Sequence, residues 1–157
     1  MTENTIPDAN LPEAARELAR ELDMQPHPEG GWFCETWRDQ PAKGGRGAGT
    51  AIYYLLAAGE VSHWHRVDAT EIWHHYSGAP LELGLSDDGI TSQRLVLGKD
   101  LAGGQRPQIV IPKDAWQSAR SLGDWTLIGC TVSPAFEFSG FELAPPGWAP
   151  QDWAQQG

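Results

Sequence analysis

The sequence predicts an all-β sandwich or barrel with one N-terminal helix. Two observations support this prediction. Apolar residues recur at helical spacing in residues 10–23, and after Gly30 the pattern changes to a period of two in about ten short segments. A chain of 157 residues is long enough for one domain with a core that needs no disulfide bonds. We therefore expect residues 1–157 to form a single domain, with its core at about residues 24–145.

The helix is predicted by the segment NLPEAARELARELD, residues 10–23. Asn10 can cap its first turn, and Glu13 three residues later completes a capping box. The apolar stripe is narrow, so we expect the helix to lie on the outside of a larger body. This stripe consists of Leu11, Ala15, Leu18 and Leu22.

The predicted strands are short, and glycine, proline or aspartate separates most of them. The segment SDDG at residues 86–89 predicts a hairpin turn. The glycine-rich residues 41–49 lack the GKS or GKT ending of a phosphate loop, so we expect a surface loop there. The strands are expected at residues 31–39, 50–57, 62–67, 70–76, 80–86, 90–97, 107–112, 116–121, 125–133 and 138–144.

Charge and composition narrow the classes of function. The net charge of −10 repels phosphate backbones and anionic lipids, so we expect no nucleic-acid partner and no membrane partner. Cys34 and Cys130 form no CxxC pair and are expected to be free thiols in a cytoplasmic protein. The N-terminal residues show neither the basic nor the apolar region of a signal peptide.

Four of the five histidines lie in the segment SHWHRVDATEIWHHYSG, residues 62–78. Alternate residues of a strand share a face, so His63 and His65 point the same way, and so do Glu71 and His75. If the two strands form a hairpin, His65 and Glu71 converge inside the barrel, with His63 and His75 as further candidates. An imidazole and a carboxylate that meet there can bind a metal or exchange a proton.

The spacing in this segment resembles the first cupin motif, G-x5-H-x-H-x3/4-E-x6-G. Gly59, His65, Val67, Glu71 and Gly78 fit every interval, but valine replaces the second histidine. The second cupin motif contains P-x-G-x2-H. The segment PKDAWQ places Pro112, Asp114 and Gln117 at those positions, so glutamine replaces that histidine.

More narrowly, the chain resembles the cupin-5 subfamily over about residues 18–145. The segments that carry the resemblance are PHPEGGWFCETWR, TAIYYLL, SHWHRVDATEIWHHYSGAPLEL, VIPKDAWQSA and CTVSPAFEFSGFEL. The resemblance implies a double-stranded β-helix, the cupin jelly roll, that pairs as a homodimer. It also implies an architecture similar to that of the dTDP-sugar epimerases, which are cupins that need no metal. No established reaction comes with it.

The residues at the cupin ligand positions leave two alternatives open. His65, Glu71 and Gln117 can hold a divalent metal with water in the remaining positions, and His63 offers a weaker alternative ligand. Val67 has no lone pair, however, and a neutral amide is a weak ligand for zinc-type metals, so the sequence requires no metal. In the second alternative, His65 and Glu71 form a buried hydrogen-bonded pair that lines a pocket for an organic ligand.

Other side chains are expected near this pocket. Glu35 can enter the barrel, whereas Arg38 is expected on the opposite face of its strand, at the surface. One of Tyr53 and Tyr54 should point inward, and Tyr53 is taken as the candidate. Trp73 flanks the site and can stack on a planar ligand, although core packing is the commoner use of tryptophan. His27 is expected in a loop and His74 at the surface, and neither is a predicted ligand.

Three functions follow as hypotheses, and the sequence does not decide whether the protein is an enzyme. In the first, the protein is a sugar or metabolite isomerase, epimerase or lyase. His65 is its acid–base group, Glu71 orients that histidine, and Gln117 and His75 bind the substrate. In the second, the protein is a metal-dependent cupin enzyme. In the third, it binds a small molecule without catalysis.

Overall fold

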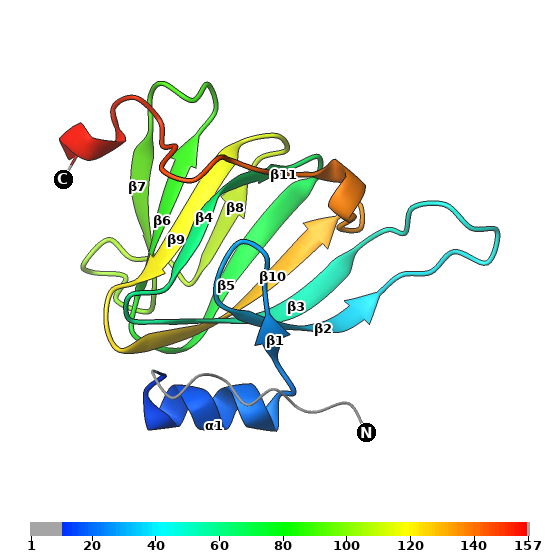
Figure 1. The fold of residues 1–157 in the computed structure, drawn as a ribbon, viewed down its shortest axis with the longest axis horizontal. Helices are drawn as coiled ribbons and strands as arrows, with labels where there is room; N and C mark the ends of the chain where they lie inside the picture. Colours follow the sequence, from blue (N-terminus) through cyan, green and yellow to red (C-terminus); the bar gives the residue numbers. More distant parts are fainter. Residues whose placement is uncertain (1–10, 157) are drawn as a thin grey trace.

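The computed structural model describes residues 11–156, which form two antiparallel sheets and one α-helix (Figure 1). This architecture confirms the all-β prediction. None of the helices in the described part of the chain is long and apolar enough to cross a membrane. The elements are α1 (Glu13–Glu21), β1 (Gln25–Pro26), β2 (Trp32–Arg38), β3 (Thr50–Ala57), β4 (Val61–Val67), β5 (Thr70–Gly78), β6 (Leu81–Ser86), β7 (Gln93–Leu97), β8 (Gln108–Ile111), β9 (Trp116–Ser121), β10 (Trp125–Ser133), η1 (Phe138–Gly140), β11 (Phe141–Leu143) and η2 (Trp153–Gln156).

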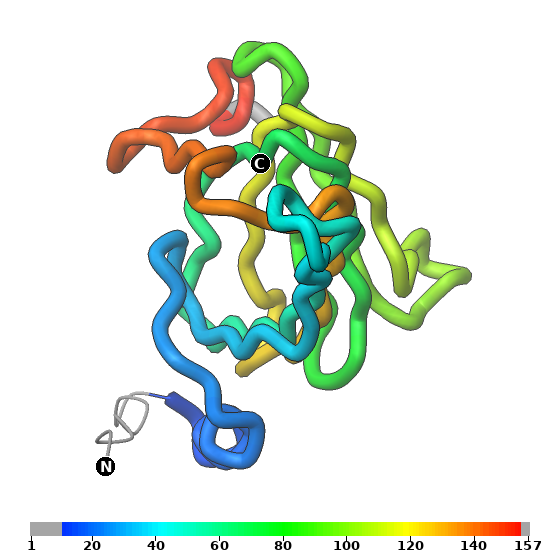
Figure 2. The backbone as a smooth tube through the Cα atoms, turned by 90° about the vertical axis from the view of Figure 1, so that its right-hand side faces the viewer, coloured from blue at the N-terminus to red at the C-terminus, as the bar shows by residue number. Residues whose placement is uncertain are grey.

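The strands follow the order β1-β2-β3-β10-β5-β8 in the first sheet and β11-β4-β9-β6-β7 in the second. Viewed from the end where the loop between β2 and β3 projects, the two sheets surround a common interior (Figure 2). Aromatic and aliphatic side chains from both sheets fill this interior. They are Tyr54, Leu56, Trp73, Leu81, Leu83, Leu97, Ile111, Ala115, Ala119, Ile128 and Cys130.

Helix α1 packs on the outside of the six-stranded sheet, as its narrow apolar stripe predicts (Figure 1). Ala15 and Ala19 are buried against Leu55 and Ala57 of β3. Pro12 precedes the first turn without a side-chain cap, because proline has no polar side-chain atom. The predicted capping residue, Asn10, lies outside the described residues.

Strands β4 and β5 do not form the predicted hairpin. Strand β4 pairs with β9 and β11 in one sheet, whereas β5 pairs with β10 and β8 in the other. Asp68 and Ala69 carry the chain from one sheet to the other. His65 and Glu71 therefore approach the barrel interior from opposite sheets and not from neighbouring strands.

A β-bulge in β2 corrects the prediction for Arg38. Glu35 pairs with Ile52 and Trp37 pairs with Ala51, so Thr36 between them is the extra residue, with no residue opposite it in the register of β3. The extra residue shifts the alternation of side chains by one position. Glu35 and Arg38 consequently share a face, on which they form an ion pair.

Candidate functional site

A cavity of about 60 Å³ lies inside the barrel, near the end where η1 crosses from β10 to β11. A cavity needs about 10–15 Å³ of this kind of space to hold one water, so it has room for several waters or a compact organic molecule. Apolar side chains supply most of its surface, and several ionisable groups interrupt them. The lining residues are His27, Glu29, Phe33, Glu35, Arg38, Thr50, Ile52, His65, Val67, Glu71, Cys130, Val132, Phe136 and Phe138.

The carboxylate that contacts the imidazole of His65 is that of Glu29, a residue that the sequence did not single out. The His65 Nε2 atom lies 3.0 Å from Glu29 Oε2, and the two side chains are only 2% and 8% exposed. The His65 Nδ1 atom lies 2.7 Å from the carbonyl oxygen of His63. Because a carbonyl only accepts, Nδ1 carries a proton and Nε2 is the atom that can exchange one.

A single proton must lie between His65 Nε2 and Glu29, because neither atom can otherwise donate to the other. Burial lowers the pKa of His65 and raises the pKa of Glu29. Both shifts favour the neutral arrangement, in which the carboxylic acid of Glu29 donates to an uncharged imidazole. The pair thus holds a transferable proton at the wall of the cavity.

Glu71 is the second acid of the cavity, and a hydrogen-bonded chain supports it from behind. Trp73 Nε1 donates to Gln117 Oε1 at 2.8 Å, and Gln117 Nε2 donates to Glu71 Oε1 at 2.8 Å. Burial raises the pKa of Glu71 to about 7, the nearby Glu29 adds to the rise, and His65 and Gln117 oppose it. Within residues 11–156, no hydrogen bond or ion pair joins Glu71 directly to His65.

Gln117 and Trp73 are buried, but the cavity lining includes neither of them. Both were predicted to contact a ligand. The amide of Gln117 instead uses its oxygen on Trp73 and its nitrogen on Glu71, so the two residues position Glu71. The ring of Trp73 packs in the core against Tyr54, with the ring centroids 5.9 Å apart.

His27 lines the cavity, and a backbone contact fixes the tautomer of its ring. The backbone N–H of Glu29 donates to His27 Nδ1 at 3.1 Å, so the neutral ring carries its proton on Nε2. Burial lowers the pKa of His27, which favours this neutral form. The rings of Phe33 and Tyr54 pack against His27 edge to face, at centroid distances of 4.6 and 5.6 Å.

The inward tyrosine is Tyr54, and the prediction of Tyr53 is wrong. Tyr54 is fully buried in the barrel core and donates its hydroxyl to the carbonyl of Gly30. Tyr53 packs on the outer side with the cluster around α1, and its ring lies 6.1 Å from that of Tyr76. Strand alternation placed the two residues on opposite faces but could not say which face was the inner one.

His63 and His75 lie away from the cavity. His63 Nε2 contacts the carbonyl of Pro145 at 3.0 Å, on the side where the C-terminal segment crosses the outer face of β4. His75 Nε2 contacts the carbonyl of Ala79 at 3.0 Å, near the end of β5, where His75 is the last residue before the register shift with β10. Neither position brings an imidazole to His65 or Glu71.

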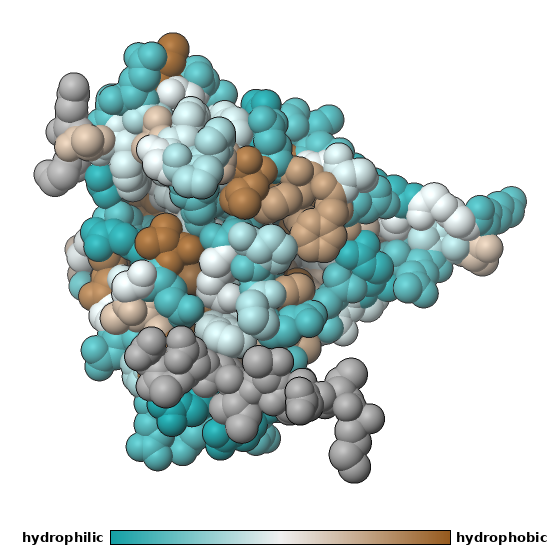
Figure 3. Space-filling model, viewed as in Figure 1, coloured by the Kyte–Doolittle hydropathy of each residue, from teal (hydrophilic) through white to brown (hydrophobic). Residues whose placement is uncertain are grey.

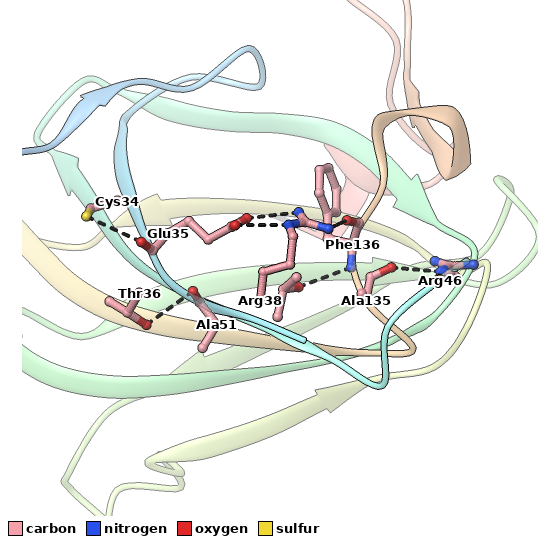
Figure 4. Close-up of polar contacts among 9 residues, drawn as sticks. Cys34, Glu35, Thr36, Arg38, Arg46, Ala51, Ala135 and Phe136 are labelled. Atoms are coloured by element: carbon pink, nitrogen blue, oxygen red, sulfur yellow. Dashed lines mark hydrogen bonds and ion pairs between the residues drawn. The ribbon is translucent and has the colours of Figure 1, made fainter. Parts of the chain in front are cut away.

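Glu35 does reach the cavity, at its mouth, together with Arg38. The two side chains point toward each other (Figure 4). Arg38 donates from Nε and Nη2 to the two carboxylate oxygens of Glu35 at 3.0 and 2.9 Å. Its Nη1 donates to the carbonyl of Phe136 at 2.8 Å. The arginine thereby connects β2 to the segment that leads into η1.

The sequence matches the Cupin_5 family, described as Cupin superfamily (DUF985), over residues 16–144. The chain belongs to this family. No curated protein matches the sequence.

Solved structures agree with this assignment. A Shewanella oneidensis protein is 36% identical, with a TM-score of 0.77 and 82% of each chain covered. A hypothetical protein from Leishmania major is 26% identical, with a TM-score of 0.77 and coverage of 90% of this chain and 93% of that one. Oxalate decarboxylase from Bacillus subtilis shares the fold at 10% identity, with a TM-score of 0.57 and coverage of 75% of this chain and 29% of that one.

The side chains at the metal-ligand positions of this cupin do not fit a metal. Val67 has no lone pair, and the Gln117 oxygen already accepts from Trp73. Both ring nitrogens of His65 already have partners: Nδ1 contacts the carbonyl of His63, and Nε2 contacts the carboxyl group of Glu29. The described residues contain no group of three His, Cys, Asp or Glu side chains arranged to hold a metal ion. The set His65, Glu71 and Gln117, with or without His63, is therefore not a ligand set in this structure.

Sequence reasoning missed His27 and Glu29, which enter the site of this cupin from the turn between β1 and β2. Gly30 and Gly31 have φ values of 111° and 75°, which side-chain-bearing residues rarely adopt. A Cβ atom on Gly30 would lie 2.0 Å from the carbonyl oxygen of Val61, so only glycine fits there. The segment HPEGG, an acid directly before two glycines, was the available signal of a tight turn that presents a carboxylate.

Proposed function

We propose that this cupin is an acid–base enzyme that moves protons on a small organic molecule, in the manner of an isomerase, epimerase or lyase. One observation carries the proposal: a Glu29–His65 pair with one shared proton and a second acid, Glu71, line the same cavity. Burial raises the pKa of Glu71 to about 7, so both of its protonation states are populated near neutral pH. Buried acids with separated roles are typical of proton-transfer sites.

The roles differ from those expected from the sequence. Glu71, as the carboxylate, takes a proton from a carbon of the substrate. The Glu29–His65 pair supplies a proton to a second position, with His65 Nδ1 held on the carbonyl of His63. Gln117 positions Glu71, and Glu29 takes over the function of orienting His65. After the transfer, Glu71 holds a proton and the Glu29–His65 pair has lost one. Proton exchange with solvent then returns both groups to their starting states.

Deuterium exchange tests this proposal directly. Ligands are first found by thermal-shift screening of a metabolite library, and each ligand is then incubated with the protein in D2O. We expect mass spectrometry and NMR to show deuterium at one carbon, with or without net conversion. We expect Glu71→Gln to reduce the exchange rate by about 100-fold or more, of the order that general acid–base groups contribute.

A matched control is Glu17→Gln, which makes the same chemical change on the exposed side of α1 and should leave exchange unaltered. A ligand that stabilises the protein without exchange or product would reject catalysis. That result would support the alternative of a non-catalytic binding protein, for which the same cavity suffices.

We also propose that the chain pairs as a homodimer. Tyr76 and Val110 are 46% and 52% exposed on β5 and β8, which are neighbours at one end of the six-stranded sheet. Exposed apolar side chains on adjacent strands favour association with a second sheet. Light scattering should give twice the mass of one chain, and Tyr76→Glu should lower it. A single-chain mass at micromolar concentration would reject the dimer.

The compartment that we propose is the cytoplasm. Cys34 and Cys130 are both free thiols, and Cys130 is buried. Free thiols of this kind persist in a reducing compartment. Fractionation of cells that produce the native chain tests this proposal, and recovery from a secreted or membrane fraction would contradict it.

A further inference from the structure

We propose that Arg38 binds an anionic oxygen group of the substrate, a carboxylate or a phosphate, and that the substrate is therefore a small organic anion. The inference rests on the proposed function of the same cavity, and it adds the substrate class. Four observations on the mouth of the cavity support it.

First, a local irregularity turns Arg38 toward the cavity. Regular alternation along β2 would put Arg38 and Glu35 on opposite faces of the strand. The bulge at Thr36 instead brings Arg38 to the inner side, where it lines the cavity with Glu35. Bulges often re-aim a side chain beside an active site.

Second, Arg38 is the one permanently cationic side chain among the described residues that line the cavity. The other ionisable lining residues are histidines, carboxylic acids and a cysteine. Burial lowers the pKa of both His27 and His65, which favours their neutral forms. An anionic group that enters the cavity therefore meets its positive partner at Arg38.

Third, two N–H groups of the Arg38 guanidinium are available to bind a ligand. Arginine carries five N–H groups, and three of them are used in the contacts with Glu35 and the Phe136 carbonyl. The other two have no hydrogen-bond partner within residues 11–156. Two N–H groups on a planar fork suit the two oxygens of a carboxylate or phosphate.

Fourth, the guanidinium is held in place before any ligand arrives. Glu35 fixes it from one side and the Phe136 carbonyl from another (Figure 4). A donor that is already oriented loses less conformational entropy on binding.

Hydrophobic residues gather around η1 and β11 beside this mouth, and they include Phe138, which is 59% exposed (Figure 3). An anion held by Arg38 would place the rest of a small molecule between these apolar walls, toward Glu71.

Calorimetric titration of the full chain with malonate, inorganic phosphate and malonamide tests the proposal. Malonamide has the shape of malonate without its charge. We expect malonate or phosphate to bind more tightly than malonamide to the wild type. We expect Arg38→Gln to weaken the preferred anion at least about tenfold and to leave malonamide unchanged, because charge-assisted hydrogen bonds are lost. Whichever of malonate and phosphate binds more tightly shows whether the site recognises a carboxylate or a phosphate.

Two further variants separate this role from a structural one. Arg38→Lys keeps the charge but not the fork, so its affinity for the anion should fall between those of the wild type and Arg38→Gln. Glu35→Gln removes the negative charge beside the guanidinium but keeps an amide oxygen that can still accept from Arg38, so it should strengthen anion binding. Arg20→Gln on the exposed surface of α1 is the control for net charge and should change nothing.

Equal affinity of the wild type and Arg38→Gln for both anions, with both proteins folded by circular dichroism, would overturn the inference. No binding of either anion by the wild type would overturn it as well. The proposed catalysis is judged separately by deuterium exchange. Anion binding without exchange would reject the catalytic proposal alone, and exchange without dependence on Arg38 would reject this inference alone.

Discussion

The side-chain amide of Gln117 donates a hydrogen bond of 2.8 Å to the Glu71 carboxylate across the barrel, from the sheet opposite to that of Glu71. The orientation of this amide is determined, because Trp73 Nε1 can only donate and occupies its oxygen. The Gln117 nitrogen must then face Glu71. At the position where a cupin metal site would have a histidine, this chain has a side chain that positions an acid.

Substitution Gln117→Leu tests this positioning role. It leaves Trp73 Nε1 and Glu71 Oε1 buried without their partner, so we expect a loss of about 2–4 kcal/mol in the free energy of unfolding. The pKa of Glu71 should rise further, because the hydrogen bond from Gln117 lowers it. Urea unfolding and carbon-13 NMR titration measure the two effects. Gln93→Leu on the exposed side of β7 should change stability by less than about 0.5 kcal/mol.

The raised pKa of Glu71 should make the free energy of unfolding depend on pH. Burial raises its pKa from the ordinary value of 4.5 to about 7. Between these values the folded state holds a proton that the unfolded chain has released. The free energy of unfolding should therefore fall by about 3 kcal/mol from this group as pH rises through the window.

Other groups act in the same pH range, so the contribution of Glu71 must be isolated. The lowered pKa values of His27 and His65 make stability rise with pH below their ordinary value of 6.5. Urea unfolding of the wild type and of Glu71→Gln at several pH values gives the difference that belongs to Glu71. A difference that does not vary with pH would show that Glu71 titrates normally.

Two substitutions of Glu29 should have different consequences for stability. In Glu29→Gln the amide can still donate to His65 Nε2, so we expect a cost below about 1 kcal/mol. In Glu29→Ala the imidazole loses its buried partner, and the cost should reach about 1–3 kcal/mol. Both variants lack the shared proton and should lose exchange of substrate protons. Equal stability of the two variants in urea would contradict the hydrogen bond that we describe.

The segment that carries Phe136 over the cavity should loosen when its anchor is removed. Thr50 Oγ1 accepts the backbone N–H of Phe136 at 3.1 Å, and Thr50 is buried. We expect Thr50→Val to accelerate hydrogen exchange of the Phe136 amide roughly fivefold, as the loss of about 1 kcal/mol implies. Thr36→Val alters a hydroxyl that bonds the Ala51 carbonyl, and it should leave the Phe136 amide unaffected.

The sequence by itself determined the class of fold and the inward direction of two site residues. The change from helical spacing to a period of two predicted α1 and the strands, because burial of one face imposes that period. The cupin spacing predicted that His65 and Glu71 enter one barrel, and both line the cavity. These features depend on residues that are close together in the chain.

Only the tertiary structure decided the partners of these residues. Glu29 reaches His65 because a two-glycine turn fits against the carbonyl of Val61, which lies on a different strand. Gln117 reaches Glu71 from 46 positions away, and the bulge at Thr36 redirects Arg38. Each result depends on contacts between distant segments and on single departures from regular alternation. Periodicity reports the average environment of a strand face, and therefore contains no information on which polar atoms meet inside the barrel.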